Sequence, residues 1–181
     1  MPKESDVVFE TPWFSVEERH LPLIQGSPET TQYYKINYPC GVVILPVTPE
    51  GNFILIHQYR PVLDKITIEI PAGAIDGDES PDQAALRELA EETGYGCDNL
   101  ILAGSGVLRI DREDALNCFY LAQNAVPIPG QDCEGGIELM SVTPLEFKDL
   151  VRSNLFDHIA ALPIFVMAEL NLGMRLLDSE R

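Results

Sequence analysis

Short runs of apolar, β-branched and aromatic residues alternate with polar punctuation in the first half of the chain. Such runs cover 33–36, 41–47 and 53–59, and Pro49, Glu50 and Gly51 interrupt the last two. This pattern predicts strands, with 41–47 and 53–59 joined as an antiparallel hairpin. The alternating run KITIEI, 65–70, predicts a further strand that is broken by Pro71.

A helix is predicted between Ser80 and Gly94. Ser80 is placed as the N-cap, Pro81 occupies the first helical position, and Gln83 completes a capping box. Gly94 supplies the stop signal, because glycine adopts the left-handed conformation at a helix C-terminus at little cost.

The second half of the chain continues the mixed pattern. Apolar runs lie at 100–103 and 119–122, a strand is predicted at 137–142, and helices are predicted near 145–152 and 159–177, where Pro163 kinks or delays the last helix. Strands therefore come first, one helix interrupts them, and further strands and helices follow. We expect an α+β fold in which helices pack on a mixed or antiparallel sheet.

Composition and charge narrow the function. In 181 residues, 12 Lys and Arg face 29 Asp and Glu, which gives a formal net charge of −17 without any basic cluster. This balance argues against partners with a polyanionic surface, both nucleic acids and anionic membranes. No apolar stretch is long enough to span a bilayer, and the N-terminus does not resemble a signal peptide. The cysteines are scattered without a CxxC pair, so we expect a soluble, cytoplasmic protein with reduced thiols: Cys40, Cys97, Cys118 and Cys133.

Carboxylates gather on the helix predicted at 80–94. At ~100° per residue, three glutamates fall within about a third of the helix circumference. They are Glu88, Glu91 and Glu92, and we expect the opposite, buried side to consist of Leu86, Leu89, Ala90 and Thr93.

Two interpretations of this acidic face remain open at this point. Glu88 and Glu92 are i,i+4 neighbours of like charge, which destabilises a helix unless a cation lies between them. Oxygen ligands suit Mg²⁺, or Mn²⁺ in its place, and Mg²⁺ is commonly shared with substrate phosphates. The alternative is a solvated acidic surface on which Glu91 pairs with Arg87.

Other motifs do not fit the sequence. An EF-hand over DGDESPDQAALR would need glycine and an acid where Pro81 and Arg87 stand. The GSG at 104–106 lacks the third glycine of a dinucleotide fingerprint. The histidines show no zinc-ligand spacing and are interpreted as structural or exposed: His20, His57 and His158.

The spacing around the acidic helix resembles the complete Nudix box. Gly73 is followed after five residues by Glu79 and after seven more by RELAEETG, 87–94, and only Tyr95 departs from the usual aliphatic residue. The segments QYRPV and EIPAG are similar to the Nudix branch that hydrolyses ADP-ribose and nucleoside diphosphate sugars. The resemblance extends from TPWFSV to the final helix.

This resemblance implies a Nudix α/β/α sandwich and an Mg²⁺-dependent diphosphatase that yields a nucleoside monophosphate and a sugar phosphate. It implies metal ligands at Glu88, Glu92 and Glu91 and at the carbonyl of Ala72. Glu79 and Arg87 would then support these ligands from behind, with Arg87 orienting the carboxylates. Arg60 corresponds to the family arginine that holds substrate phosphate.

Substrate recognition departs from the family pattern after the box. ADP-ribose enzymes commonly carry Ser-Pro-Gly there, whereas this chain has GSGVLRIDREDALN, so the base and sugar stay open. Arg109 and Arg112 either contact phosphate or sugar or belong to a surface ion-pair network with the neighbouring acids.

Related enzymes draw the base that activates water from a loop beyond the box. Here the corresponding loop is PIPGQDCEGGIEL, whose acids are Asp132, Glu134 and Glu138. Glu134 is the predicted base, because Gly135 and Gly136 beside it allow the loop to close over substrate, whereas Glu138 falls within the expected strand.

The chain is divided into an N-terminal β segment, 1–40, and a Nudix domain, 41–181. A homodimer is expected, both from the resemblance and because the N-terminal segment carries apolar residues that need burial: Val7, Val8, Phe9, Trp13 and Phe14. Burial in the segment's own core is the alternative. Two other functions are hydrolysis of NADH or a dinucleoside polyphosphate, and a catalytically silent Nudix fold that senses a ligand, which the complete box disfavours.

Overall fold

The computed structural model describes residues 6–178 and divides into two compact units. One unit contains the chain up to residue 40 together with residues 107–116, and the other contains residues 41–106 and the chain from 117 onward. Within the described residues, no helix is long and apolar enough to cross a membrane.

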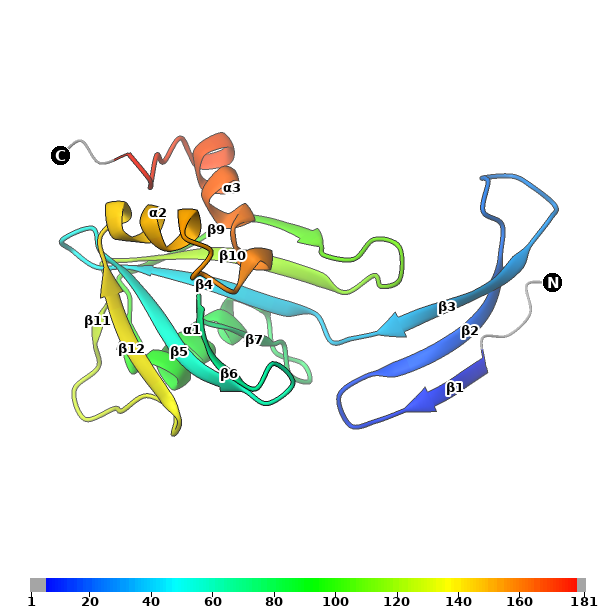
Figure 1. Ribbon diagram of the computed structural model, residues 1–181, viewed down its shortest axis with the longest axis horizontal. Helices are drawn as coiled ribbons and strands as arrows, with labels where there is room; N and C mark the ends of the chain where they lie inside the picture. The colour runs from blue at the N-terminus through cyan, green and yellow to red at the C-terminus, as the bar shows by residue number, and fades with distance from the viewer. Residues whose placement is uncertain (1–5, 179–181) are drawn as a thin grey trace. The chain divides into compact units, whose positions relative to one another are not determined.

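The first unit is built on an antiparallel sheet in the order β1-β2-β3 (Figure 1). The strands are β1 (Asp6–Glu10), β2 (Ser15–Leu21) and β3 (Thr31–Asn37), and a bulge interrupts the β1–β2 register between Val7 and Phe9. The sequence predicts only the third of these strands. The segment 107–116 joins this unit through a hydrogen bond from the amide of Ile36 to the carbonyl of Arg112 at 2.8 Å.

The second unit contains a seven-stranded mixed sheet, which confirms the predicted sheet type. Its main path is β12-β5-β4-β10-β9, with β6 beside β5 and β7 beside β4. These strands are β4 (Gly41–Val47), β5 (Phe53–Arg60), β6 (Lys65–Glu69), β7 (Ala72–Ala74), β9 (Asn99–Val107), β10 (Leu116–Gln123) and β12 (Ile137–Val142). A separate ribbon pairs β8 (Tyr95–Gly96) with β11 (Val126–Pro127).

The predicted hairpin is present, but β4 and β5 share only the pair Val47 and Phe53. Beyond this point the two strands diverge, and β6 and β7 fill the opening by pairing with β5 and β4. On its other side β4 runs parallel to β10. The divergence of β4 from β5 brings β7, which carries Ala72 and Gly73, into the sheet.

Helices cover both faces of this sheet and give the expected α/β/α sandwich (Figure 1). Ala84, Ala85 and Leu89 of α1 (Pro81–Thr93) pack against even-numbered residues of β4 and β10. On the opposite face, α2 (Pro144–Arg152) and α3 (Pro163–Leu172) pack against odd-numbered residues of the same strands, with an aromatic cluster at the centre: Phe53, Phe147, Phe156 and Phe165.

Strand alternation fixes which side chains of β5 face α1. Phe53 and Leu55 belong to the core under α2 and α3, so Gln58 and Arg60 lie on the α1 face. The register of β6 places Thr67 opposite Gln58. Polar residues at the ends of β5 and β6 therefore share one face of the sheet with the acidic helix.

The last helix differs from its prediction. Residues Ile159–Ala161 form a single 3₁₀ turn, and α3 begins at Pro163, as the expected delay at this proline requires. The helix ends at Leu172 rather than at residue 177, because Gly173 adopts a left-handed conformation with φ of 69°.

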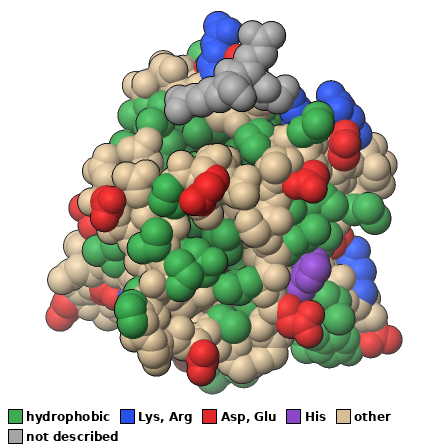
Figure 2. Space-filling view, turned by 90° about the vertical axis from the view of Figure 1, so that its left-hand side faces the viewer, with side chains coloured by type: hydrophobic (Ala, Val, Ile, Leu, Met, Phe, Trp, Pro, Cys, Tyr) green, Lys and Arg blue, Asp and Glu red, His purple; other side chains and the backbone are tan. Residues whose placement is uncertain are grey.

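Acidic side chains stand singly among apolar ones on the face of the molecule shown in Figure 2. The negative charges on this face are thus dispersed rather than clustered.

Candidate active site

The ends of α1 are fixed by the capping residues that the sequence predicts. The side chain of Ser80 accepts a hydrogen bond from the amide of Gln83 at 3.2 Å, and the Gln83 side chain accepts one from the amide of Ser80 at 2.9 Å. Gly94 closes the helix with φ of 68°. This reciprocal cap satisfies two amides that would otherwise lack partners and sets where the helix starts.

The acidic face of α1 is not the exposed face that the helical wheel predicts. Glu92 is only 6% exposed, whereas Leu86 is 46% exposed, so the expected division into acidic and buried sides is wrong. Glu92 turns inward because its Oε2 atom accepts a hydrogen bond from the amide of Ala72 at 2.8 Å. A carboxylate thus occupies part of the buried face of the helix and holds it to β7.

Glu88 lies against the main chain of Gly73. A Cβ atom placed on Gly73 would stand 1.9 Å from Oε1 of Glu88, so any side chain at this position would displace the carboxylate. This close contact requires a residue without a side chain at position 73. The contact with Glu88, rather than a turn, therefore explains the glycine.

Burial makes both inward-facing carboxylates poorly suited to carry charge alone. Burial raises the pKa of Glu92 to about 7, and the neighbouring charge of Glu88 adds to the effect. Burial likewise raises the pKa of Glu88, while Arg87 acts in the opposite direction. A cation bound between these two groups would offset both the desolvation and the repulsion.

Arg87 ties the carboxylates and the preceding loop together. Its Nε and Nη2 atoms each donate to Glu79 at 3.0 Å, and Nη1 donates to Glu88 at 2.8 Å and to Glu91 at 3.0 Å. Nη2 also donates to the carbonyl of Ala74 at 2.9 Å. The guanidinium group therefore fixes the orientation of Glu88 relative to β7, and these bonds raise its own pKa.

The residues around β7 fit a hard divalent cation in part. Glu88 and Glu92 both approach the main chain at 72–73, which contains the carbonyl of Ala72 that is predicted as a third oxygen ligand. Glu91 points toward Arg87, and its side chain is half-exposed. Within the described residues, no three His, Cys, Asp or Glu side chains stand together as a metal cluster. The candidate donor set is thus two carboxylates and a main-chain oxygen, a number that leaves room for water and substrate oxygens.

Arg60, the predicted phosphate ligand, forms a two-pronged ion pair with Glu69. Nε of Arg60 donates to Oε1 at 2.7 Å, and Nη2 donates to Oε2 at 2.6 Å. Glu69 is buried, and it also accepts from the hydroxyl of Thr67 at 2.6 Å. Burial raises the pKa of Glu69, but these two donors outweigh it and hold the pKa below its usual value.

The pair with Glu69 uses only one edge of the Arg60 guanidinium. The remaining edge, with Nη1, has no hydrogen-bond partner among residues 6–178. Arg60 is therefore oriented by Glu69 and can still donate to an anionic ligand. The sequence prediction gave Glu69 no role, although this residue opens the EIPAG segment that carries part of the family resemblance.

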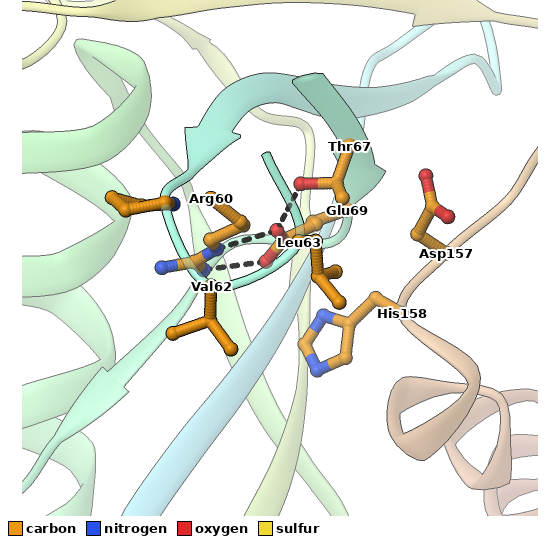
Figure 3. A pocket seen from close by; sticks show the side chains of 8 residues that line it. Arg60, Val62, Leu63, Thr67, Glu69, Asp157 and His158 are labelled. Atoms are coloured by element: carbon orange, nitrogen blue, oxygen red, sulfur yellow. Dashed lines mark hydrogen bonds and ion pairs between the residues drawn. The ribbon is translucent and has the colours of Figure 1, made fainter. Parts of the chain in front are cut away.

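A cavity of about 440 Å³ opens beside this ion pair (Figure 3). Its walls come from the end of β5, the turn that follows, β6, and the segment before the 3₁₀ turn. The lining residues are Arg60, Pro61, Val62, Leu63, Thr67, Glu69, Asp157 and His158.

The loop after β11 lies on the C-terminal part of α1. The amide of Glu134 donates to the carbonyl of Glu91 at 2.7 Å, and the Gln131 side chain donates to the carbonyl of Ala90 at 2.8 Å. The side chain of Glu134 is exposed. The loop thus contacts the acidic helix through the main chain of Glu134 and the side chain of Gln131, and closure of the loop over substrate stays a prediction.

The sequence also named Glu138, Arg109 and Arg112 as candidates. Glu138 pairs with His57, which places its side chain on the face of the sheet opposite to Gln58 and Arg60. Arg109 and Arg112 belong to the first unit. Arg109 pairs with Glu113 at 3.3 Å, and the guanidinium of Arg112 lies 4.4 Å from the centre of the Tyr33 ring.

Comparison with known proteins identifies the family. Residues 37–155 match the model of the NUDIX domain, so the chain belongs to the Nudix family. A solved structure described as an ADP compounds hydrolase superposes with a TM-score of 0.76 at 23% identity and covers 97% of this chain and 96% of its own, which confirms the Nudix fold.

Two curated relatives are similar in sequence. The ADP-ribose pyrophosphatase of Bacillus subtilis (strain 168) is 45% identical over 121 residues, 65% of either chain. The ADP-sugar pyrophosphatase of Mus musculus is 57% identical over 99 residues, which cover 50% of this chain and 45% of the mouse protein. The chain thus spans less than two thirds of the length of these relatives.

Proposed function

We propose that this protein is a metal-dependent diphosphatase that hydrolyses ADP-ribose or a nucleoside diphosphate sugar to a nucleoside monophosphate and a sugar phosphate. The observation that carries the proposal is the juxtaposition of Glu88 and Glu92 with the main chain at 72–73, in a family whose similar members are named for this activity.

In this proposal Glu88, Glu92 and the carbonyl of Ala72 hold Mg²⁺, or Mn²⁺, and Glu91 contributes when it leaves Arg87. The bound cation supplies charge neutralisation at the diphosphate and makes its phosphorus more electrophilic. Arg87 orients Glu88 from behind, and Arg60 uses its open edge to donate to a phosphate oxygen. Arg109 and Arg112, which belong to the first unit, are proposed to contact the phosphate or sugar of the substrate.

The hydrolytic step needs a base and a leaving group. Water attacks one phosphorus while the bond from that phosphorus to the bridging oxygen breaks, and the bridging oxygen leaves with the other phosphate. The proton of the attacking water passes to the carboxylate of Glu134. The hydrogen bond from the amide of Glu134 to the carbonyl of Glu91 supports this role, because it holds the loop beside the acidic helix.

The proposed assembly is a homodimer formed through the first unit. All five residues of β1 are exposed, and Trp13 is 75% exposed, so an apolar surface remains on this sheet. The four free thiols agree with the proposed cytoplasmic location.

The test is an assay of purified protein with Mg²⁺ against ADP-ribose, a panel of nucleoside diphosphate sugars, NADH and dinucleoside polyphosphates. Chromatography of the products is expected to show a nucleoside monophosphate and a sugar phosphate from ADP-ribose or from a nucleoside diphosphate sugar. Preference for NADH or a dinucleoside polyphosphate would replace the proposed substrate. Binding without turnover on every substrate would support the ligand sensor instead.

A further inference from the structure

Two residues that line the cavity beside Arg60 carry a polar atom without a hydrogen-bond partner among residues 6–178, namely Arg60 itself, at Nη1, and His158. Arg60 and Glu69 bind each other, the Thr67 hydroxyl donates to Glu69, and Asp157 accepts from the amide of Ile68 and pairs with Lys65. The charges in and around the cavity therefore cancel in pairs. His158 belongs to none of these pairs, and only one of its ring nitrogens has a partner among the described residues.

The chemistry of that partner fixes the role of the other nitrogen. Nδ1 of His158 lies 3.2 Å from the carbonyl oxygen of Ile70, which can only accept, so Nδ1 carries the proton. Burial lowers the pKa of His158, although Glu69 acts in the opposite direction, and the net effect favours the neutral ring. Nε2 is then a hydrogen-bond acceptor, on a ring that lines the cavity (Figure 3).

The position of Arg60 defines what can enter. In a nucleoside diphosphate sugar each phosphate is esterified to a sugar, so the group next to a phosphate held by Arg60 is a sugar whichever phosphate binds there. Sugar hydroxyls are donors that Nε2 can accept. The apolar wall of Pro61, Val62 and Leu63 suits the C–H surface of the same ring.

We propose that this cavity binds the sugar attached to the phosphate at Arg60, and that His158 determines specificity by accepting a hydrogen bond from one of its hydroxyls. The proposal rests on the proposed function and deepens it. It also revises the interpretation of His158 as merely structural, because the hydrogen bond to Ile70 serves to aim the ring.

Two substitutions separate the orienting bond from Nδ1 to Ile70 from the proposed acceptor role of Nε2. His158→Asn keeps an N–H that can donate to Ile70 and removes the acceptor at Nε2, whereas His158→Gln keeps an acceptor near the Nε2 position. We expect His158→Asn to raise KM for the best substrate roughly 3- to 10-fold, the effect of one neutral hydrogen bond, with kcat little changed. His158→Gln should lie closer to wild type. His57→Asn, on the opposite face of the sheet, is the matched control and should leave KM unchanged.

Product inhibition tests the same contact with compounds that the protein binds but does not hydrolyse. Ribose 5-phosphate, AMP and inorganic phosphate are compared as inhibitors of wild type and His158→Asn. Either ribose 5-phosphate or AMP should inhibit the variant roughly 3- to 10-fold more weakly than wild type. Inorganic phosphate should inhibit both proteins equally. The affected compound identifies whether the nucleoside ribose or the second sugar occupies the cavity.

The outcomes are distinguishable. If wild type hydrolyses a nucleoside diphosphate sugar and His158→Asn has unchanged KM and inhibition constants, this assignment alone is overturned. Equal weakening of all three inhibitors would also overturn it, because that result indicates displacement of Arg60. If wild type hydrolyses no such substrate, the proposed function fails and the assignment fails with it.

Discussion

At the scale of single residues, the site is organised by side chains that bind one another before any ligand arrives. Arg87 holds Glu79, Glu88 and Glu91, and Glu69 holds Arg60. Groups fixed in this way lose little further freedom when a substrate binds, so the positions of Glu88 and Arg60 are set in advance. Glu92 differs, since it is fixed by the amide of Ala72 alone.

Glu88 and Glu92 provide the first residue-scale prediction. Changing either to Gln should lower kcat by about 10²-fold or more, because several kcal/mol of charge stabilisation depend on the cation that we propose they hold. The thermal midpoint measured without added metal should not fall, since each change removes a like charge from α1 and Gln at position 92 can still accept from Ala72. Glu50→Gln, an exposed acid of the β4–β5 turn, is the control. Near-normal activity of both α1 variants would show that the cation is held elsewhere.

The sequence indicated these residues more reliably than their surroundings. The box spacing picked out Glu79, Arg87, Glu88 and Glu92, because fixed spacing along one helix and its preceding loop is local information. The wheel misplaced Glu92 because burial of a carboxylate depends on an amide from β7, which no helical periodicity contains. Glu69 was missed because its role depends on the pairing of two strands.

At the scale of elements, local signals determined what could be foreseen. The caps of α1 and the delayed start of α3 follow from Ser80, Gln83, Gly94 and Pro163, whose preferences act within one turn of the chain. The parallel pairing of β4 with β10 joins segments more than 70 residues apart. Such long-range contacts leave no pattern in either strand alone.

The loop that carries Glu134 supplies the element-scale prediction. Glu134→Gln should lower the maximal rate by ~10²–10⁴-fold, the usual range for loss of a general base, with little change in KM or in metal affinity. The main-chain bond from residue 134 to Glu91 does not involve the carboxylate, so the loop should stay in place.

Asp132→Asn is the matched control in the same loop, and its kinetic constants should stay near those of wild type. Both variants are measured by initial rates over a range of substrate and Mg²⁺ concentrations. The base lies elsewhere if Glu134→Gln retains most of its activity while Asp132→Asn or Glu91→Gln loses it.

At the scale of the whole molecule, the exposed apolar residues of the first unit predict self-association. Val7, Val8 and Phe9 are each at least half exposed although they follow one another along β1, so both faces of the strand present apolar surface. Light scattering of the purified protein at micromolar concentration should give the mass of a dimer. A monomeric mass would refute the homodimer. If the dimer forms, Trp13→Ser should weaken it, because the Trp13 side chain is 75% exposed in the single chain.

The pairing of Arg60 with Glu69 has a consequence for the conditions under which the protein can work. The pair offers a directed donor but no net positive charge, in a chain whose formal charge is −17. On the proposed function, a diphosphate substrate and a divalent ion would then bind jointly, and each would raise the apparent affinity of the other by the same factor. Turnover in a cell would accordingly follow the free concentration of the ion as well as that of the substrate.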